Sequence, residues 1–72
     1  MGNAFRTGQW VTWSWGQGEA RGKIASRHEM RVERQIDGST IARNGSAENP
    51  AYEIHQEDGA RVLKLGSELE AG

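Results

Sequence analysis

Residues 9–15 read Gln-Trp-Val-Thr-Trp-Ser-Trp, and this stretch decides how the chain begins to fold. The side chains of a β-strand point to alternate faces, so Trp10 must point away from Trp13 and Trp15. Both faces of the predicted strand therefore carry a large aromatic ring. We expect at least one of these rings to be partly exposed, either as a binding surface or as packing beneath a loop.

Glycines divide the rest of the chain into strand-length segments. An Asp-Gly pair flanked by alternating apolar residues predicts a hairpin, because a type I′ turn needs positive φ at both central positions. The pair occurs at 37–38 and at 58–59, while residues 16–19 form another connection and Asn44-Gly45 is predicted to be a turn. The predicted strands are 9–15, 21–26, 31–36, 39–42, 51–55 and 60–64, followed by one helical turn at 67–70. The arginines at 27, 31 and 34 leave a short helix over 27–36 as an alternative.

Short strands at regular spacing favour one small, partly closed barrel in a chain of 72 residues, because closure hides exposed strand edges. Residues 5–70 are predicted to form this single domain, after a disordered segment 1–4. Gly22 is expected where the sheet curls or another backbone comes close. The barrel ends should partly cover Leu63 and Leu65. The predicted core consists of Val11, Trp13, Ile24, Val32, Ile36 or Ile41, Tyr52, Ile54, Val62 and Leu69.

The length and composition of the chain argue against a disulfide-stabilised protein, a metalloprotein, an enzyme and a membrane protein. A domain this short buries only about 60–65% of its unfolded surface, and without cysteine it has neither a disulfide nor a thiolate metal site. The two histidines, His28 and His55, fall in different predicted hairpins and form no catalytic constellation, so we predict no enzymatic activity, no metal and no cofactor. No stretch has the length and apolarity of a signal peptide or membrane span, so a cytoplasmic protein without a membrane partner is expected.

Charge is distributed unevenly along the chain, although its formal net value is only −1. Residues 1–46 carry seven basic and four acidic side chains, whereas residues 47–72 carry two basic and six acidic ones. The middle strands could therefore present a basic, phosphate-binding face. Charges of both signs interleave there, however, and a solvated strand face is the commoner outcome of such a pattern.

Several motifs together resemble a known family. Phe5-Arg6-Thr7-Gly8, Val11-Thr12-Trp13 and Gly22-Lys23-Ile24 resemble the opening strands of SH3-like and Tudor-like barrels. Residues 43–52 (Arg-Asn-Gly-Ser-Ala-Glu-Asn-Pro-Ala-Tyr), then Asp58-Gly59 and 62–69, are similar to the bacterial and fungal hypervirulence-associated proteins with a Tudor domain. The resemblance spans residues 5–69. It implies an all-β, SH3-like (Tudor-like) barrel of five to six short antiparallel strands with a short C-terminal helical turn.

The first functional hypothesis is a non-enzymatic binding module of the Tudor type, engaging a protein or peptide through an aromatic surface. Aromatic rings at a barrel mouth can hold an alkylated ammonium by cation–π attraction, worth about 0.5–2 kcal/mol per ring. The candidate rings are Trp10, Trp15 and Tyr52, with Glu19 or Glu53 as counter-charge. The alternative is that Tyr52 belongs to the core and Trp15 caps the barrel.

The second hypothesis is nucleic-acid binding by a basic strand face, with Trp10 as a ring on which a base can stack. The basic residues of this face are Arg21, Lys23, Arg27, Arg31, Arg34 and Arg43. A third possibility is a structural or interaction domain whose partner recognises an exposed sheet edge, or a self-associating domain whose own edge pairs to form a dimer. The sequence leaves the partner and the oligomeric state open.

Overall fold

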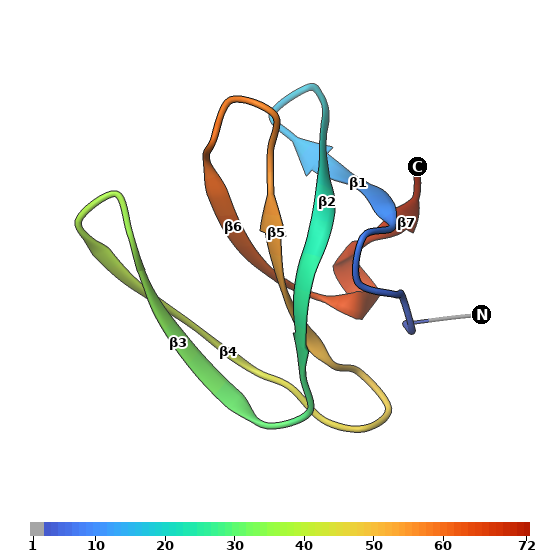
Figure 1. The fold of residues 1–72 in the computed structure, drawn as a ribbon, viewed down its shortest axis with the longest axis vertical. Helices are drawn as coiled ribbons and strands as arrows, with labels where there is room; N and C mark the ends of the chain where they lie inside the picture. The colour runs from blue at the N-terminus through green and yellow to red at the C-terminus, as the bar shows by residue number, and fades with distance from the viewer. Residues whose placement is uncertain (1–2) are drawn as a thin grey trace.

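The chain forms two antiparallel sheets in a computed structural model that describes residues 3–72 (Figure 1). The strands are β1 (Trp10–Trp15), β2 (Gly18–His28), β3 (Arg31–Ile36), β4 (Ser39–Asn44), β5 (Ala51–His55), β6 (Arg61–Leu65) and β7 (Glu70–Ala71), with a 3₁₀ turn η1 (Gly66–Glu68) before β7. A five-stranded sheet has the order β6-β5-β2-β1-β7, and β3 and β4 form a separate hairpin. The predicted all-β, Tudor-like fold with its C-terminal helical turn is confirmed, and β7 is an additional strand.

The alternation predicted for residues 9–15 sets the first hydrophobic core. Val11 and Trp13 are buried, Trp10 is half-buried on the other face, and Trp15 is exposed. The buried residues of this sheet core are Val11, Trp13, Ile24, Tyr52, Ile54 and Leu69, with Phe5, Ala20 and Val62 packed against them. The 3₁₀ turn η1 places Leu69 in this core, as the sequence predicted.

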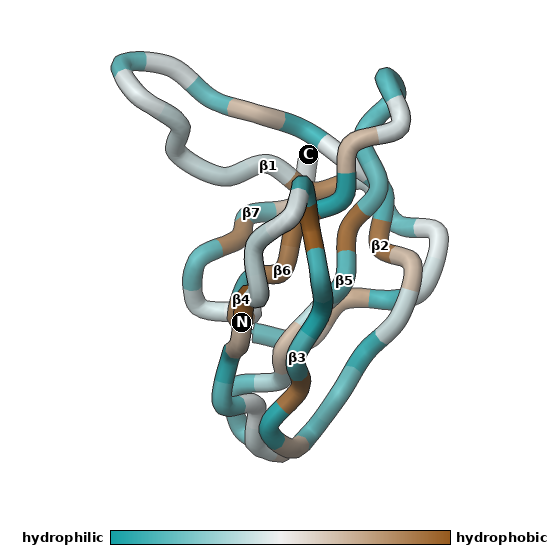
Figure 2. The backbone as a smooth tube through the Cα atoms, turned by 90° about the vertical axis from the view of Figure 1, so that its left-hand side faces the viewer, coloured by the Kyte–Doolittle hydropathy of each residue, from teal (hydrophilic) through white to brown (hydrophobic). Residues whose placement is uncertain are grey.

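A second, smaller core lies on the opposite face of β5 and β6. Its buried residues are Val32, Ala51 and Leu63, with Ile36, Ile41 and Leu65 packed against them. The hairpin β3–β4 covers this face, so Leu63 is only 2% exposed, and the prediction that barrel ends would cover it only partly was wrong. We call this cluster the hairpin core. In Figure 2 the hydrophobic stretches lie in the strands, and the connections are mainly hydrophilic or neutral.

The two Asp-Gly pairs adopt different conformations. Asp37 and Gly38 both have positive φ (52° and 80°), as a type I′ turn requires. At the second pair only Gly59 has positive φ. The Gln56 N–H donates to the Ala60 carbonyl, and the Asp58 carboxylate accepts from the Ala60 N–H. The prediction of a type I′ turn there was wrong, because these hydrogen bonds stabilise a longer loop.

Two glycines mark places where backbones approach closely. A Cβ at Gly22 would lie 2.6 Å from Ile54 Cγ2 and 3.0 Å from the His55 carbonyl oxygen, which confirms the predicted close approach. Gly45 was predicted to form a turn with Asn44, but its φ is not positive and a Cβ there would clash with the His28 backbone. This prediction was wrong, because Gly45 is needed where the chain passes the end of β2.

Strand β2 is longer than predicted, because its pairing with β1 extends to Trp15 opposite Gly18. The predicted connection 16–19 is therefore shortened to a turn, and residues 31–36 form a strand rather than the alternative helix. Of the segment 1–4 predicted to be disordered, residues 1–2 lie outside the described residues. Asn3 accepts a hydrogen bond from the Tyr52 hydroxyl through its carbonyl. No helix within residues 3–72 is long and apolar enough to cross a membrane.

Candidate functional site: a groove beside an exposed tryptophan

The three aromatic residues predicted to share a surface lie in three different environments. Tyr52 is fully buried, its hydroxyl accepts from the Phe5 N–H at 2.9 Å, and the Phe5 ring meets its ring edge to face. Trp10 lies on the face of β1 opposite Trp13. Trp15 is 70% exposed at the end of β1. These three rings therefore form no common cage, because the core takes Tyr52 and the strand pleat separates the two tryptophans.

Trp15 lines a groove of about 640 Å³ together with residues of β6 and of the β3–β4 hairpin. In Figure 1 the two elements diverge toward the β3–β4 turn. The apolar lining comes from three segments far apart in the sequence: Trp13 and Trp15, Ile36 and Ile41, and Val62 and Leu63. We call this feature the hairpin groove. Trp13 and Leu63 are buried, so the apolar surface that the groove offers to solvent comes from Trp15, Ile36, Ile41 and Val62.

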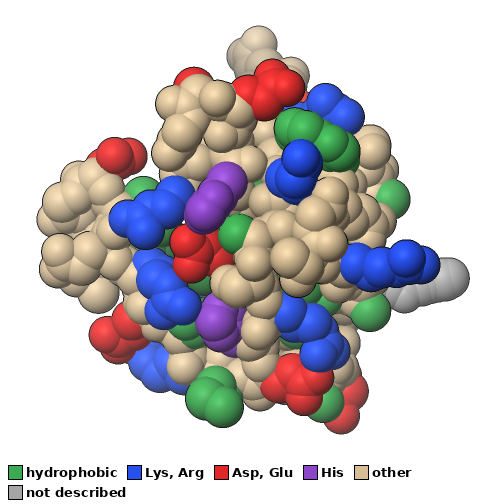
Figure 3. Space-filling view, viewed as in Figure 1, with side chains coloured by type: hydrophobic (Ala, Val, Ile, Leu, Met, Phe, Trp, Pro, Cys, Tyr) green, Lys and Arg blue, Asp and Glu red, His purple; other side chains and the backbone are tan. Residues whose placement is uncertain are grey.

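Most of the predicted basic face is neutralised by carboxylates. Arg27 pairs with Glu29, Arg31 with Glu33, Arg34 with Glu53, and Arg43 with Glu68. Figure 3 shows Lys and Arg side chains interleaved with Asp and Glu side chains across this view of the molecule. This pattern matches the solvated strand face that was the alternative to a phosphate-binding patch.

Arg21 and Lys23 are arranged differently from the other four basic residues. The Arg21 guanidinium lies 4.2 Å from the centroid of the Trp10 ring, and the Lys23 ammonium lies 5.1 Å from it. Lys23 is directly opposite Trp10 in the β1–β2 ladder. Such cation–π contacts are worth about 0.5–1 kcal/mol each at exposed sites. Within residues 3–72 neither cation forms an ion pair.

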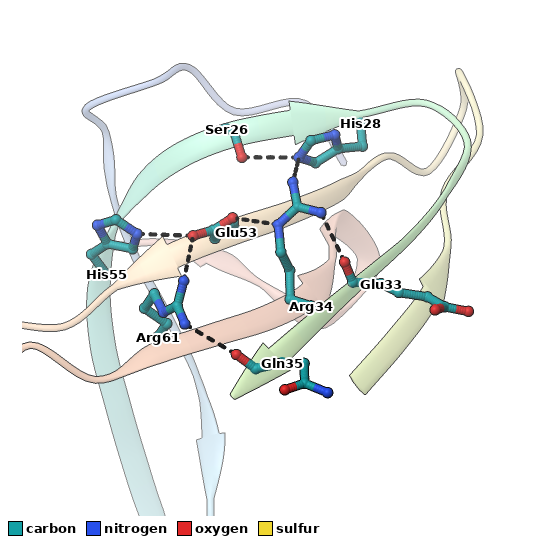
Figure 4. A network of polar contacts seen from close by, with 8 residues as sticks. All are labelled: Ser26, His28, Glu33, Arg34, Gln35, Glu53, His55 and Arg61. Atoms are coloured by element: carbon teal, nitrogen blue, oxygen red, sulfur yellow. Dashed lines mark hydrogen bonds and ion pairs between the residues drawn. The ribbon is translucent and has the colours of Figure 1, made fainter. Parts of the chain in front are cut away.

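A polar network centred on Glu53 joins the hairpin to the five-stranded sheet (Figure 4). The Glu53 carboxylate, 13% exposed, accepts from Arg34 Nε and His55 Nε2, each at 3.0 Å, and lies 4.0 Å from Arg61 Nη1. Arg61 also donates to the Gln35 carbonyl at 3.0 Å. The hydrogen bond from His55 lowers the pKa of Glu53 below its usual value. Burial opposes this pKa shift, and Arg34 reinforces it.

Glu53 is thus occupied within the protein and is not the counter-charge of an aromatic cage. Sequence reasoning missed its network because Arg34 and Glu53 are separated by 19 positions and meet only after the hairpin folds over β5. It also missed the groove wall formed by Ile36 and Ile41. The one sequence feature that could have indicated the groove was Trp15, a large aromatic residue at the end of a strand next to a turn.

Comparison with known families adds to this geometry. The family described as "Hypervirulence associated proteins TUDOR domain" matches residues 8–69 of the chain. The chain belongs to this family. No curated protein and no solved structure matches the chain. Membership in this family of Tudor-like domains points to a non-enzymatic binding module. A shared fold does not identify the binding target, so the target has to be inferred from the geometry of this domain.

Proposed function

We propose that this hypervirulence-associated TUDOR domain is a non-enzymatic binding module that takes a protein or peptide segment in the hairpin groove. The observation that carries the proposal is Trp15, a large ring that is 70% exposed and lines the hairpin groove together with other apolar side chains. Exposed aromatic rings are enriched among the residues that dominate protein–protein binding energy. The apolar side chains at the other positions of the groove supply area that a bound segment can cover.

The charges favour a peptide over a phosphate backbone at this site. Asp37 and Asp58 line the groove, and so do Arg43 and Arg61. Each of these arginines already faces a carboxylate, Glu68 and Glu53 respectively. A polyanion would therefore meet the carboxylates of Asp37 and Asp58 as well as the cations of Arg43, Arg61 and Lys64, whereas a peptide can match a surface of mixed charge.

Selection from a random-peptide display library against the whole domain tests this proposal. Trp15→Ala should weaken binding of a selected peptide by about thirtyfold, the effect of losing a hot spot of about 2 kcal/mol. Met30→Ala is the matched control, because Met30 is also 70% exposed but does not line the groove. Equal affinity of both variants, or failure to select any peptide, would contradict groove binding.

The cluster of Trp10, Arg21 and Lys23 supports a second candidate function, the binding of single-stranded nucleic acid. A base could stack on the ring while the two cations contact phosphates, and stacking contributes about 1–3 kcal/mol. Amide NMR titration with a single-stranded and a duplex oligonucleotide at two salt concentrations tests it. Salt-sensitive shifts at the Trp10 indole that are lost in Arg21→Ala/Lys23→Ala, but not in Arg31→Ala, would support it. Absence of shifts would contradict it.

A further inference from the structure

The strand β6 has one open edge, and this edge lies along the hairpin groove. It is the terminal strand of the five-stranded sheet and pairs only with β5, from Ala51 opposite Leu65 to His55 opposite Arg61. The hairpin packs near β6, but within residues 3–72 no strand forms a ladder with its second edge, where the Leu65 N–H donates to the Glu68 carboxylate at 2.8 Å and the stretch from Arg61 to Lys64 remains open. A strand edge exposes backbone N–H and C=O groups that can pair with another chain.

Both faces beside this edge are apolar. Val62 packs toward the sheet core, and in the groove it is accompanied by Trp13 and Trp15. Leu63 points the opposite way, into the hairpin core with Ile36 and Ile41. Consecutive residues of a strand added next to β6 would point alternately to these two sides. Such a strand could therefore bury apolar side chains at successive positions.

The charges along the groove indicate what else an added segment should carry. Asp37 in the β3–β4 turn and Asp58 in the β5–β6 loop both line the groove. Neither carboxylate forms an ion pair in the part of the chain that the structure describes. Arg61, which also lines the groove here, is held by Glu53 and the Gln35 carbonyl. A further cationic side chain near these two turns would therefore find complementary charge in Asp37 and Asp58, whereas an anionic one would be repelled by them.

We propose that the hairpin groove binds an extended peptide as an additional strand along β6. The segment carries apolar residues at successive positions and a Lys or Arg at the end next to Asp37 and Asp58. The inference rests on the proposed function and deepens it. Main-chain hydrogen bonds to β6 supply affinity in this mode of recognition, and side-chain contacts supply specificity.

Backbone N-methylation of a peptide selected from the display library separates strand addition from other modes of groove binding. Alternate residues of an added strand donate to the neighbouring edge. N-methylation at one set of alternate positions should therefore weaken binding by about tenfold or more, and methylation at the intervening positions should be tolerated. The amides on the open edge of β6 should become protected from hydrogen exchange in the complex.

The remaining outcomes of these experiments separate strand addition from other modes of binding. If the peptide loses affinity in Trp15→Ala but shows no alternation on methylation, groove binding stands and strand addition is overturned. If no peptide is selected, both fail. If sedimentation shows that the domain alone forms dimers with protected β6 amides, the open edge serves a second copy of the chain, and the peptide inference is overturned.

The cationic requirement is tested with the double variant Asp37→Asn/Asp58→Asn. Asn tolerates the positive φ of residue 37 and can accept the hydrogen bond from Ala60, so the variant should fold. Binding of a peptide with a Lys or Arg at the predicted end should fall several-fold at low salt. Glu57→Gln, next to Asp58 in the same loop but not part of the groove lining, is the control. Equal affinity of both variants would contradict the charge assignment.

Discussion

The five-stranded sheet and the β3–β4 hairpin are held in place by different interactions. The sheet has antiparallel ladders between all of its neighbouring strands and a core of six buried side chains. The hairpin has no ladder to the sheet among residues 3–72, and it packs through only three buried residues and the Glu53 network. The sheet therefore determines whether the domain folds, and a few side chains determine where the hairpin lies. Since the hairpin forms one wall of the groove, those side chains also determine the shape of the site.

The largest expected effect is in the sheet. Gly22→Val would place a branched side chain against Ile54 and the His55 backbone, so the variant should lose about 3 kcal/mol of unfolding free energy. Gly18→Val is the control, because Gly18 has open space around its Cβ position and no positive φ. Chemical denaturation followed by tryptophan fluorescence measures both. Equal stability of the two variants would show that the contact at Gly22 is unimportant.

A smaller and more local effect is expected in the hairpin core. Leu63→Ala removes a side chain that is 2% exposed, and such truncations cost about 2–5 kcal/mol in well-packed cores. We expect the lower end of this range, because solvent in the adjacent groove can fill the space. Hydrogen exchange should accelerate most at the β3 and β4 amides. A uniform acceleration over both sheets would contradict the separation of the two cores.

The smallest stability effect concerns the polar network. Glu53→Gln removes the charged acceptor of Arg34 and His55 and should cost about 1–2 kcal/mol. Glu33→Gln is the control, because the Arg31–Glu33 pair is more than half exposed and should be worth less than about 0.5 kcal/mol. Equal losses of unfolding free energy in the two variants would argue against a special role for Glu53.

The same network predicts a pH dependence. The pKa of Glu53 is lowered in the folded state, so the carboxylate stabilises the protein fully above its unfolded value of about 4.5. This contribution is lost as the pH falls through the folded-state pKa. The stability difference between the wild type and Glu53→Gln should therefore shrink below about pH 4.5. Denaturation curves at pH 7, 5 and 3 measure this, and a difference independent of pH would contradict it.

Local patterns determined much of the fold. The alternation around Trp13, the Asp37-Gly38 turn and the close approach at Gly22 could all be predicted, because each depends on strand periodicity or on the backbone freedom of one residue type. The second Asp-Gly pair and Asn44-Gly45 were assigned wrongly. In both cases contacts from neighbouring segments, the Gln56–Ala60 hydrogen bond and the His28 backbone, decided the conformation.

The site depended much more on tertiary structure. The sequence by itself determined that Trp10 and Trp15 would lie on opposite faces of one strand, because side chains alternate along any strand. Only the tertiary structure decided that four of the six predicted basic residues face carboxylates, and that Trp15 borders a groove along the open edge of β6. These features arise from contacts between segments far apart in the chain, and no local pattern of residues encodes where such segments meet.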